Sequence, residues 1–136
     1  MGSVAQSSPA TPQGPLAGRV AVITGATRGI GRAIVDELTG LGARVFGVAR
    51  SEDDLRALAD ELDIAYLAAD IAKERECRKV IDNALEEVGS VDILVNKAGI
   101  GAAGEGRIWD QDPERWRQTM AVNLDAPFQG LRSLWG

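Results

Sequence analysis

Short apolar runs alternate along this chain with longer segments in which apolar residues recur at helical spacing. A run of a few apolar residues predicts a β-strand, whereas apolar residues three and four positions apart predict one face of a helix. The runs predict four strands, at residues 20–24, 43–49, 65–69 and 91–95. The last of these runs has Asp92 as its only polar residue, which is typical of a strand covered on both faces.

Helices are expected between the predicted strands. The periodic segments lie at residues 29–41, 51–62 with Ser51 as the N-cap, and about 73–88. Their predicted inward faces consist of apolar residues: Ile30, Ala33, Ile34, Leu38 and Leu41 in the first, Leu55, Leu58, Ala59 and Leu62 in the second, and Val80, Ile81, Ala84, Leu85 and Val88 in the third. Gly42 and Gly89 follow the first and third segments and are expected to end them.

A last helix is predicted to begin near Asp112, a favoured N-cap residue that precedes a proline. One face of this helix carries Trp116, Met120, Asn123, Leu124, Phe128 and Leu131. We interpret Trp116 and Phe128 as core residues because of this spacing. Pro127 costs about 3 kcal/mol inside a helix unless the helix kinks or ends there.

Repeated alternation of strand and helix predicts an α/β fold with a parallel sheet, right-handed crossovers and helices on both faces. In such doubly wound sheets a ligand binds at the carboxyl ends of the strands, where the strand order reverses. Residues 1–18 are rich in small and polar residues, lack acidic residues and show no periodicity. They are interpreted as a disordered tail, and residues 19–136 as one nucleotide-binding domain.

The composition narrows the class of protein. A chain of 136 residues, 45% hydrophobic and 26% charged, is typical of one globular domain. Its net charge of −5, without a basic cluster, argues against a nucleic-acid or anionic-membrane partner. No apolar run approaches the roughly 20 residues of a membrane span. A small metabolite is the expected partner.

Cys77 is the single cysteine, and the chain has no histidine. Neither an internal disulfide nor a zinc site is therefore expected, no metal is predicted, and Cys77 is interpreted as a helix residue without a special role. A reducing compartment, the cytoplasm, is the expected location. Import into an organelle through residues 1–18 is the alternative, disfavoured because no arginine precedes Arg19.

The segment Thr24-Gly25-Ala26-Thr27-Arg28-Gly29-Ile30-Gly31 joins the first predicted strand to the first predicted helix. Its glycines permit a sharp turn, close approach of backbone N–H groups to an anion, and close packing of helix on strand. The N-terminus of the following helix also favours a phosphate group. The segment therefore predicts a dinucleotide-binding turn.

Four motifs in order make the chain resemble the short-chain dehydrogenase/reductase family. They are Thr24-Gly25-x-x-x-Gly29-Ile30-Gly31, Asp70 after the third strand, Asn96-Lys97-Ala98-Gly99 after the fourth, and Val122-Asn123-Leu124 in the last helix. The resemblance covers about residues 19–128 and implies a Rossmann-type sheet, a nicotinamide cofactor and hydride transfer between an alcohol and a carbonyl group. Residues 34–38 and 42–43 also resemble the tropinone-reductase-like branch.

The resemblance also implies roles for individual residues. Asn123 is similar to the family's catalytic-helix asparagine, which supports a helix distortion and a water in the proton relay; a buried amide satisfied by local backbone is the alternative. For Asp70, a hydrogen bond to the adenine amino group is implied, and a helix N-cap is the alternative. The implied cofactor-binding residues are Thr24, Gly25, Thr27, Arg28, Gly29, Ile30, Gly31, Arg50, Asp70, Ile71, Asn96, Ala98 and Gly99.

Charge predicts which cofactor is preferred. An NAD site usually has a carboxylate at the end of the second strand, where this chain has Arg50. Arg50 and Arg28 lie where a 2′-phosphate would lie, and guanidinium groups suit phosphate. NADP is therefore predicted over NAD. Two solvated surface arginines are the alternative, and Glu52 and Asp53 weaken the positive field.

Two departures from the family pattern are evident. Lys97 stands where the family has a second asparagine. The family's catalytic Ser, Tyr and Lys have no counterpart: Tyr66 is the only tyrosine, lies in a predicted strand and is followed four positions later by Asp70. The general acid that carbonyl reduction requires is therefore absent from these residues.

The expected strand order is 3-2-1-4, which makes the run at 91–95 an edge strand that has no proline, and no charge beyond Asp92, to protect its exposed backbone. The domain is therefore interpreted as truncated at its C-terminal end. One hypothesis is the cofactor-binding part of an NADP-dependent oxidoreductase that acts, in a longer form, on a small carbonyl or alcohol substrate. The alternatives are a non-catalytic NADP-binding or dimer-partner module, paired through the 91–95 edge or as a homo-oligomer, and a decayed sequence without a stable fold.

Overall fold

The computed structural model describes residues 13–100 and 107–135. Four parallel strands form one sheet in the order β4-β3-β2-β5, which is the predicted order 3-2-1-4. The strands are β2 (Val20–Thr24), β3 (Arg44–Ala49), β4 (Ala65–Ala68) and β5 (Ile93–Asn96). Val22 of β2 pairs with Phe46 on one side and with Leu94 on the other.

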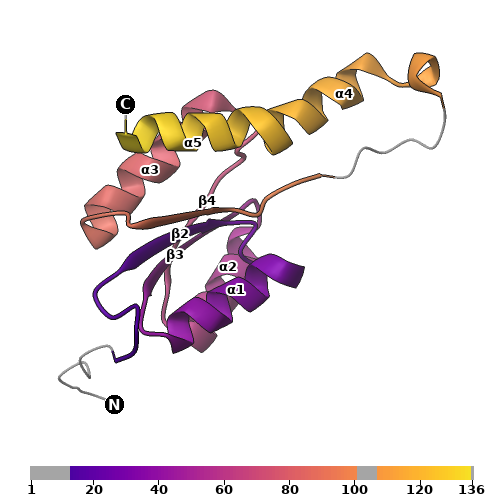
Figure 1. Ribbon diagram of the computed structural model, residues 1–136. Helices are drawn as coiled ribbons and strands as arrows, with labels where there is room; N and C mark the ends of the chain where they lie inside the picture. The colour runs from indigo at the N-terminus through magenta and orange to yellow at the C-terminus, as the bar shows by residue number, and fades with distance from the viewer. Residues whose placement is uncertain (1–12, 101–106, 136) are drawn as a thin grey trace.

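Helices cover both faces of this sheet (Figure 1). They are α1 (Gly29–Gly40), α2 (Glu52–Leu62), α3 (Glu74–Val88), α4 (Pro113–Met120) and α5 (Ala126–Trp135), with a 3-10 turn η1 (Ile108–Asp110) before α4 and a π-helical segment η2 (Ala121–Asp125) between α4 and α5. Helices α1 and α2 lie on one face, and α3 and α5 on the other. The predicted doubly wound α/β arrangement is confirmed.

The core has two layers because side chains of β2 alternate between the faces of the sheet. Val20 and Val22 pack with α3 in one cluster, whereas Ala21 and Ile23 pack with Val35 of α1 in the other. All four β2 side chains are almost fully buried. Strand β2 is thus the central strand of the part of the fold that the structure describes.

The predicted inward faces of α1 and α3 were partly wrong. In α1 the buried residues are Gly31 and Val35, whereas Ile30 is 65% exposed and Ala33 is exposed. The close approach of Gly31 to the glycine turn rotates the helix so that Ile30 lies outside. In α3, Leu85 lies at the margin of the buried stripe and is 42% exposed. The remaining residues predicted for α3, and those for α2, are buried or half-buried.

The interpretation of Trp116 and Phe128 as core residues was wrong. Their side chains are 61% and 59% exposed, and the structure assigns no buried residue to α4. Small residues face the rest of the molecule instead: Ala126 and Gly130 are buried, and a Cβ on Gly130 would lie 3.4 Å from Leu94 Cδ2. Close packing of α5 thus uses its small-residue face and leaves the large apolar side chains outside.

Pro127 is accommodated by a change of helix type. The N–H of Ala126 donates to the carbonyl of Ala121, five residues earlier, and α5 begins at Ala126. Pro127 therefore lies in the first turn of a new helical segment, where a missing N–H costs little. The expected irregularity near Pro127 thus takes the form of a π-helical segment just before it, and the helical residues continue on both sides.

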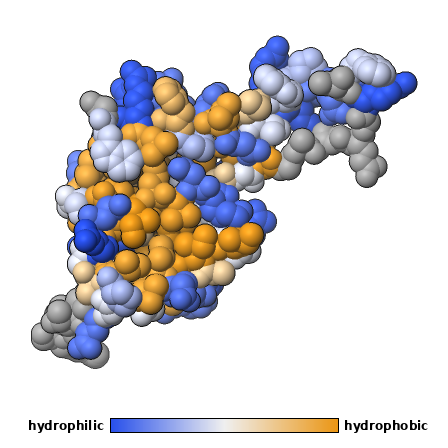
Figure 2. Space-filling model, viewed as in Figure 1, coloured by the Kyte–Doolittle hydropathy of each residue, from blue (hydrophilic) through white to orange (hydrophobic). Residues whose placement is uncertain are grey.

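Strand β5 has a partner on one side only within the described residues. Its residues Ile93, Leu94 and Val95 are half-buried rather than covered on both faces. Figure 2 shows apolar surface over this side of the sheet, between α5 and α1. The expectation of an exposed edge is confirmed, and the expectation of a strand buried on both faces is wrong for these residues.

The predicted tail, residues 1–18, falls largely on residues 1–12, outside the described part. Residues 13–18 form a turn against the end of α1, where the N–H of Leu16 donates to the carbonyl of Leu41 at 3.0 Å.

Candidate functional site

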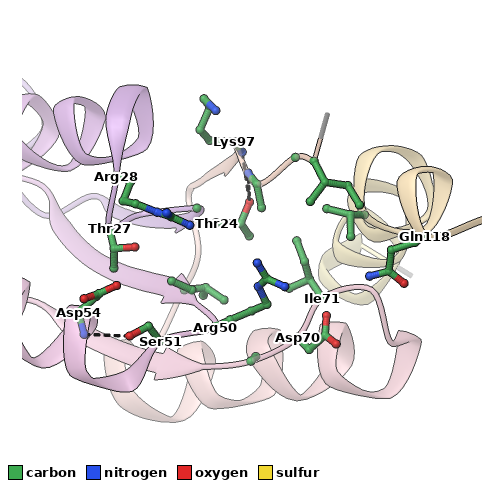
Figure 3. A pocket seen from close by; sticks show the side chains of 18 residues that line it. Thr24, Thr27, Arg28, Arg50, Ser51, Asp54, Asp70, Ile71, Lys97 and Gln118 are labelled. Atoms are coloured by element: carbon green, nitrogen blue, oxygen red, sulfur yellow. Dashed lines mark hydrogen bonds between the residues drawn. The ribbon is translucent and has the colours of Figure 1, made fainter. Parts of the chain in front are cut away.

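A cleft of about 530 Å³ lies at the carboxyl ends of the strands. This is the place where strand order reverses, since β2 leads to β3 on one side and neighbours β5 on the other. Its lining comes from the segments that follow all four strands and from the last helical region (Figure 3): Thr24, Gly25, Thr27, Arg28, Val48, Ala49, Arg50, Ser51, Asp54, Ala69, Asp70, Ile71, Lys97, Ala98, Gly99, Ile100, Gln118 and Val122.

The glycine turn is packed too tightly for side chains. A Cβ on Gly31 would overlap the carbonyl oxygen of Gly25, and a Cβ on Gly25 would lie 2.9 Å from the backbone nitrogen of Ala98. Gly25 also has φ +66°, a value that L side chains rarely adopt. These contacts hold the start of α1 against the turn and the turn against the segment after β5.

The side chain of Thr24 joins the ends of the two central strands. Its hydroxyl accepts hydrogen bonds from the N–H groups of Lys97 and Ala98, both at 3.1 Å, and donates to the carbonyl of Val95 at 3.4 Å. Thr24 is 7% exposed. A buried hydroxyl with three partners fixes the floor of the cleft where β2 meets β5.

Two guanidinium groups point into the cleft, those of Arg28 and Arg50 (Figure 3). Neither forms an ion pair within 4.0 Å among residues 13–100 and 107–135. The carboxylates of Asp54 and Asp70 also line the cleft. The cleft therefore offers cations for an anionic ligand group and carboxylates for a hydrogen-bond donor.

Hydrogen bonds to nearby residues fix both the carboxylate and the backbone of Asp70. One carboxylate oxygen accepts the N–H of Ala72 at 3.1 Å, and the N–H of Asp70 donates to Glu76 Oε1 at 3.0 Å. Helix α3 begins at Glu74 with Lys73 in the N-cap position, so the alternative of Asp70 as the N-cap was wrong. The second carboxylate oxygen has no hydrogen bond among the described residues.

Most of the predicted cofactor-binding residues meet in this cleft. Those lining it are Thr24, Gly25, Thr27, Arg28, Arg50, Asp70, Ile71, Ala98 and Gly99, whereas Gly29, Ile30, Gly31 and Asn96 lie beside it without lining it. Sequence reasoning assigned no ligand role to Ser51, Asp54, Ile100, Gln118 or Val122. Ser51 and Asp54 come soon after the end of β3, a position where ligand-binding residues are expected, and Val122 belongs to the motif Val122-Asn123-Leu124, whereas no pattern in the sequence signals Gln118.

Asn123 lies in the π-helical segment, so the helix is distorted at this residue, as the resemblance implied. Its amide oxygen accepts the N–H of Ile100 at 2.9 Å, and its amide nitrogen donates to the carbonyl of the same residue at 2.9 Å. The side chain does not itself line the cleft. It fixes the segment after Gly99, which does.

Other chemistry-bearing residues lie elsewhere. Cys77 is a buried thiol whose Sγ donates to the carbonyl of Ile71 at 3.0 Å, and burial, with the nearby charges of Glu74 and Asp70, raises its pKa. Tyr66 is half-buried in β4. Within the described ranges, no group of three or more potential metal ligands occurs, and no helix is long and apolar enough to cross a membrane.

Comparison with known proteins identifies relatives. Residues 19–135 match the family model described as short chain dehydrogenase. The chain is 36% identical over 114 residues to 3-oxoacyl-(acyl-carrier-protein) reductase of Escherichia coli, covering 82% of this chain and 46% of that protein. It is 38% identical over 120 residues to a short chain dehydrogenase of Pseudocercospora fijiensis, covering 85% and 39%.

Solved structures are similar in fold and sequence. A metagenomic short-chain oxidoreductase in complex with NADP superposes with TM-score 0.82 and 40% identity, covering 88% of this chain and 56% of that one. A 3-ketoacyl-(acyl-carrier-protein) reductase from Brucella melitensis complexed with NADH gives TM-score 0.81 and 34% identity, covering 87% and 49%. The chain thus spans about half the length of the relatives it matches. None of these names points to the tropinone-reductase-like branch, which stays a prediction.

Proposed function

The chain belongs to the short-chain dehydrogenase family, and from this premise we propose that it is the cofactor-binding part of an NADP-dependent oxidoreductase. The proposed reaction is hydride transfer between an alcohol and a carbonyl group of a small substrate. One observation carries the proposal: the cleft at the carboxyl ends of the strands combines the glycine turn with Arg28 and Arg50. When bound, a nicotinamide cofactor supplies or accepts the hydride.

The strand order suggests how a dinucleotide lies in the cleft. Asp70 and Ile71 follow β4 at one edge of the sheet and are proposed to bind the adenine. Arg50 follows β3 and is proposed to bind the 2′-phosphate together with Arg28. The glycine turn follows β2 and would hold the pyrophosphate, and the end of β5 with the residues that follow it, from Asn96 to Gly99, would contact the far ribose.

The start of α1 fits a pyrophosphate. Its N-cap residue, Arg28, makes no side-chain cap hydrogen bond, and its first turn has no acidic residue. A Cβ on Gly29 would meet no atom within 4 Å, so the approach to the helix end is open. Uncapped N–H groups at a helix N-terminus favour an anion.

Preference for NADP rests on Arg50. Solved relatives include one complexed with NADP and one with NADH, so family membership alone does not select the cofactor. A cation at the end of β3 favours a 2′-phosphate, whereas a carboxylate there would favour the ribose hydroxyls of NAD. The alternative of two solvated surface arginines predicts equal affinity for the two cofactors.

Catalysis is proposed to require residues outside this chain. We propose that Tyr66 is not the proton donor, because it lies in β4 and is not among the residues that line the cleft. Asn123 is proposed to act through the backbone of Ile100 and the distorted helix. The proton donor and the substrate site are proposed to belong to the rest of a longer protein.

Cytoplasmic location is proposed because Cys77 is a buried, unpaired thiol.

A second candidate is a non-catalytic NADP-binding module that pairs with another chain. The open edge of β5 favours it, because an edge strand without charge or proline is a template for pairing. A second copy of this chain, or a longer relative, is the proposed partner.

Calorimetric titration of the 136-residue chain with NADP and with NAD tests the proposal. NADP is expected to bind more tightly. Tighter binding of NAD would overturn the cofactor preference, and binding of neither would overturn the proposed function. Reduction of a carbonyl substrate by this chain alone would contradict the location of the proton donor.

A further inference from the structure

The segment proposed to bind the adenine lies between β4 and α3 and belongs to neither. Hydrogen bonding to β3 continues as far as Ala69, whose N–H donates to the carbonyl of Ala49 at 2.9 Å. Helix α3 begins at Glu74. Asp70 and Ile71, which line the cleft, are therefore held by contacts other than those of the sheet.

The first turn of α3 holds both polar groups of the Asp70 backbone. Glu76 Oε1 accepts the N–H of Asp70 at 3.0 Å, and the N–H of Lys73 donates to the carbonyl of Asp70 at 3.1 Å. Glu76 is the third residue of α3, a position from which a carboxylate commonly accepts the N–H of the N-cap residue. Here the N-cap residue, Lys73, donates to Asp70 instead, and the Glu76 carboxylate reaches beyond it. Glu76 thus fixes a segment of the cleft.

The next residue of the helix holds Ile71. The thiol of Cys77 donates to the carbonyl of Ile71 at 3.0 Å, and the N–H of Ala72 donates to the Asp70 carboxylate at 3.1 Å. Cys77 is 4% exposed, so a substitution there would also change the packing of the core. Glu76 is half-buried, and its carboxylate can be removed without opening the core.

Glu76 does not line the cleft, so it acts on a ligand only through the segment that it holds. An ionised carboxylate accepts hydrogen bonds and cannot donate them. Asp70, held in place, would therefore favour a purine with an amino group over one with a carbonyl oxygen at the same ring position. We propose that Glu76 is a positioning residue for adenine recognition, because it fixes the Asp70 carboxylate where it accepts a hydrogen bond from the adenine amino group. This inference rests on the proposed function, which places the adenine at Asp70 and Ile71.

The hypoxanthine counterpart of NADP, in which a carbonyl oxygen replaces the adenine amino group, tests the inference. Calorimetric titration of the 136-residue chain is expected to show tighter binding of NADP than of this analogue. In Glu76→Ala that preference is expected to shrink about fivefold, because the hydrogen bond to the amino group is weakened while the other contacts of the dinucleotide are kept. Glu76→Gln retains an oxygen that can accept the Asp70 N–H and is expected to retain most of the preference.

Glu74→Ala is the matched control and is expected to leave the preference unchanged. It removes a carboxylate from the same turn of α3, and the exposed Glu74 side chain pairs with Arg78 of the same helix. Glu76→Asp is a second test, because it keeps the charge and draws the carboxylate back by one methylene group. It is expected to lose the preference as Glu76→Ala does. Thermal melting of each variant shows whether its fold is retained.

An unchanged preference in a folded Glu76→Ala or Glu76→Asp variant would overturn the inference. An equal loss of affinity for both ligands, or loss of cooperative melting in both variants, would also overturn it, since Glu76 would then support the fold alone. A similar loss of preference in Glu74→Ala would assign the effect to the charge of the helix turn and contradict the role of Glu76.

Two outcomes for the unaltered chain separate the inference from its premise. Equal binding of NADP and the hypoxanthine analogue would overturn the placement of adenine at Asp70, and the role of Glu76 with it. Binding of neither dinucleotide would overturn the proposed function itself.

Discussion

Arg50 is the residue at which one substitution is expected to change the cofactor. Arg50→Asp removes the proposed 2′-phosphate ligand and introduces the carboxylate that suits ribose hydroxyls. The affinity for NADP is expected to fall by about tenfold or more relative to NAD, since hydrogen bonds to charged groups contribute about 1.5–3 kcal/mol. Arg44→Asp is the control, because Arg44 is exposed at the opposite end of the same strand. Equal changes for both cofactors, measured by calorimetry, would contradict the assignment.

Gly31 is expected to be intolerant of even one methyl group. The Cβ of Gly31→Ala would overlap the carbonyl of Gly25, so helix and turn must move apart. The free energy of unfolding is expected to fall by about 1–3 kcal/mol, the usual range for overpacking. At Gly40, the last residue of α1, a Cβ meets no atom within 4 Å, and Gly40→Ala is expected to be neutral or stabilising by up to about 1 kcal/mol. Urea denaturation of both variants makes the comparison.

Cys77 is expected to make stability depend on alkaline pH. Burial raises the pKa of its thiol, so the folded chain keeps a proton that the unfolded chain loses. The contribution of the protonated thiol to the free energy of unfolding is complete below the pKa of the unfolded thiol, about 8.5. It is lost as pH rises through the higher pKa of the folded state. The loss of stability above that pH is expected to be smaller in Cys77→Ala. Identical pH profiles of unfolding free energy for the unaltered chain and Cys77→Ala would contradict this role of the Cys77 thiol.

The sequence was enough to identify many of the residues of the site, but it did not predict which residues they contact in the fold. The glycines of the turn and the residues after each strand were identified because backbone geometry and strand ends constrain them. The contacts of Lys97 with Thr24 and Gly31 were not, because they join positions more than 60 apart through a pairing of strands that no local pattern encodes.

At the scale of elements, Asn123 connects the π-helical segment to the segment after β5. Asn123→Ala removes both hydrogen bonds to Ile100. Because the site is exposed, the free energy of local opening at the Ile100 amide is expected to fall by about 1 kcal/mol. Amide exchange at Ile100 is then expected to be about fivefold faster. Asn83→Ala is the control, since its side chain bonds only within α3. Unchanged exchange at Ile100, measured by NMR, would exclude this connection.

The places of the helices along the chain were predicted, with α4, η2 and α5 taken as one helix, but the side that each helix turns toward the sheet was not always predicted. The periodicity of α2 was sufficient because its apolar residues form one narrow stripe. In α5 the largest apolar residues were taken as the inward face, whereas Ala126 and Gly130 face inward. The distance between helix and sheet decides which face of the helix is buried. This distance cannot be predicted from the pattern of hydrophobic residues alone.

At the scale of the whole molecule, the open edge of β5 is expected to cause self-association. The N–H of Asp92 donates to Val20, so by strand alternation the N–H groups of Ile93 and Val95 point away from β2. Ile93→Pro removes an outward donor and leaves the bonds to β2 in place. Sedimentation is expected to show association of the unaltered chain and less association of the variant. A monodisperse, cooperatively melting monomer of the unaltered chain would contradict the expectation.

The sheet order was predictable from the alternation of elements together with the family resemblance, because few topologies satisfy right-handed crossovers and short connections. Pro127 alone indicated that the helix is irregular near this position, but not that the irregularity is a π-helical segment. Pro127 required a kink or an end, and the structure meets that requirement with a wide turn that also carries Asn123.

The pairing of β5 with β2 also has a kinetic consequence. Pairs β2–β3 and β3–β4 join successive strands, whereas β2 and β5 bring together Val20 and Asp92, 72 positions apart. Closing a longer loop costs more entropy, and contacts between distant positions form late in folding. The wall of the cleft that carries Arg50 and Asp70 is therefore expected to assemble first, with the Lys97 wall docking afterwards. In refolding experiments a dinucleotide that contacts both walls should slow unfolding more than it speeds folding.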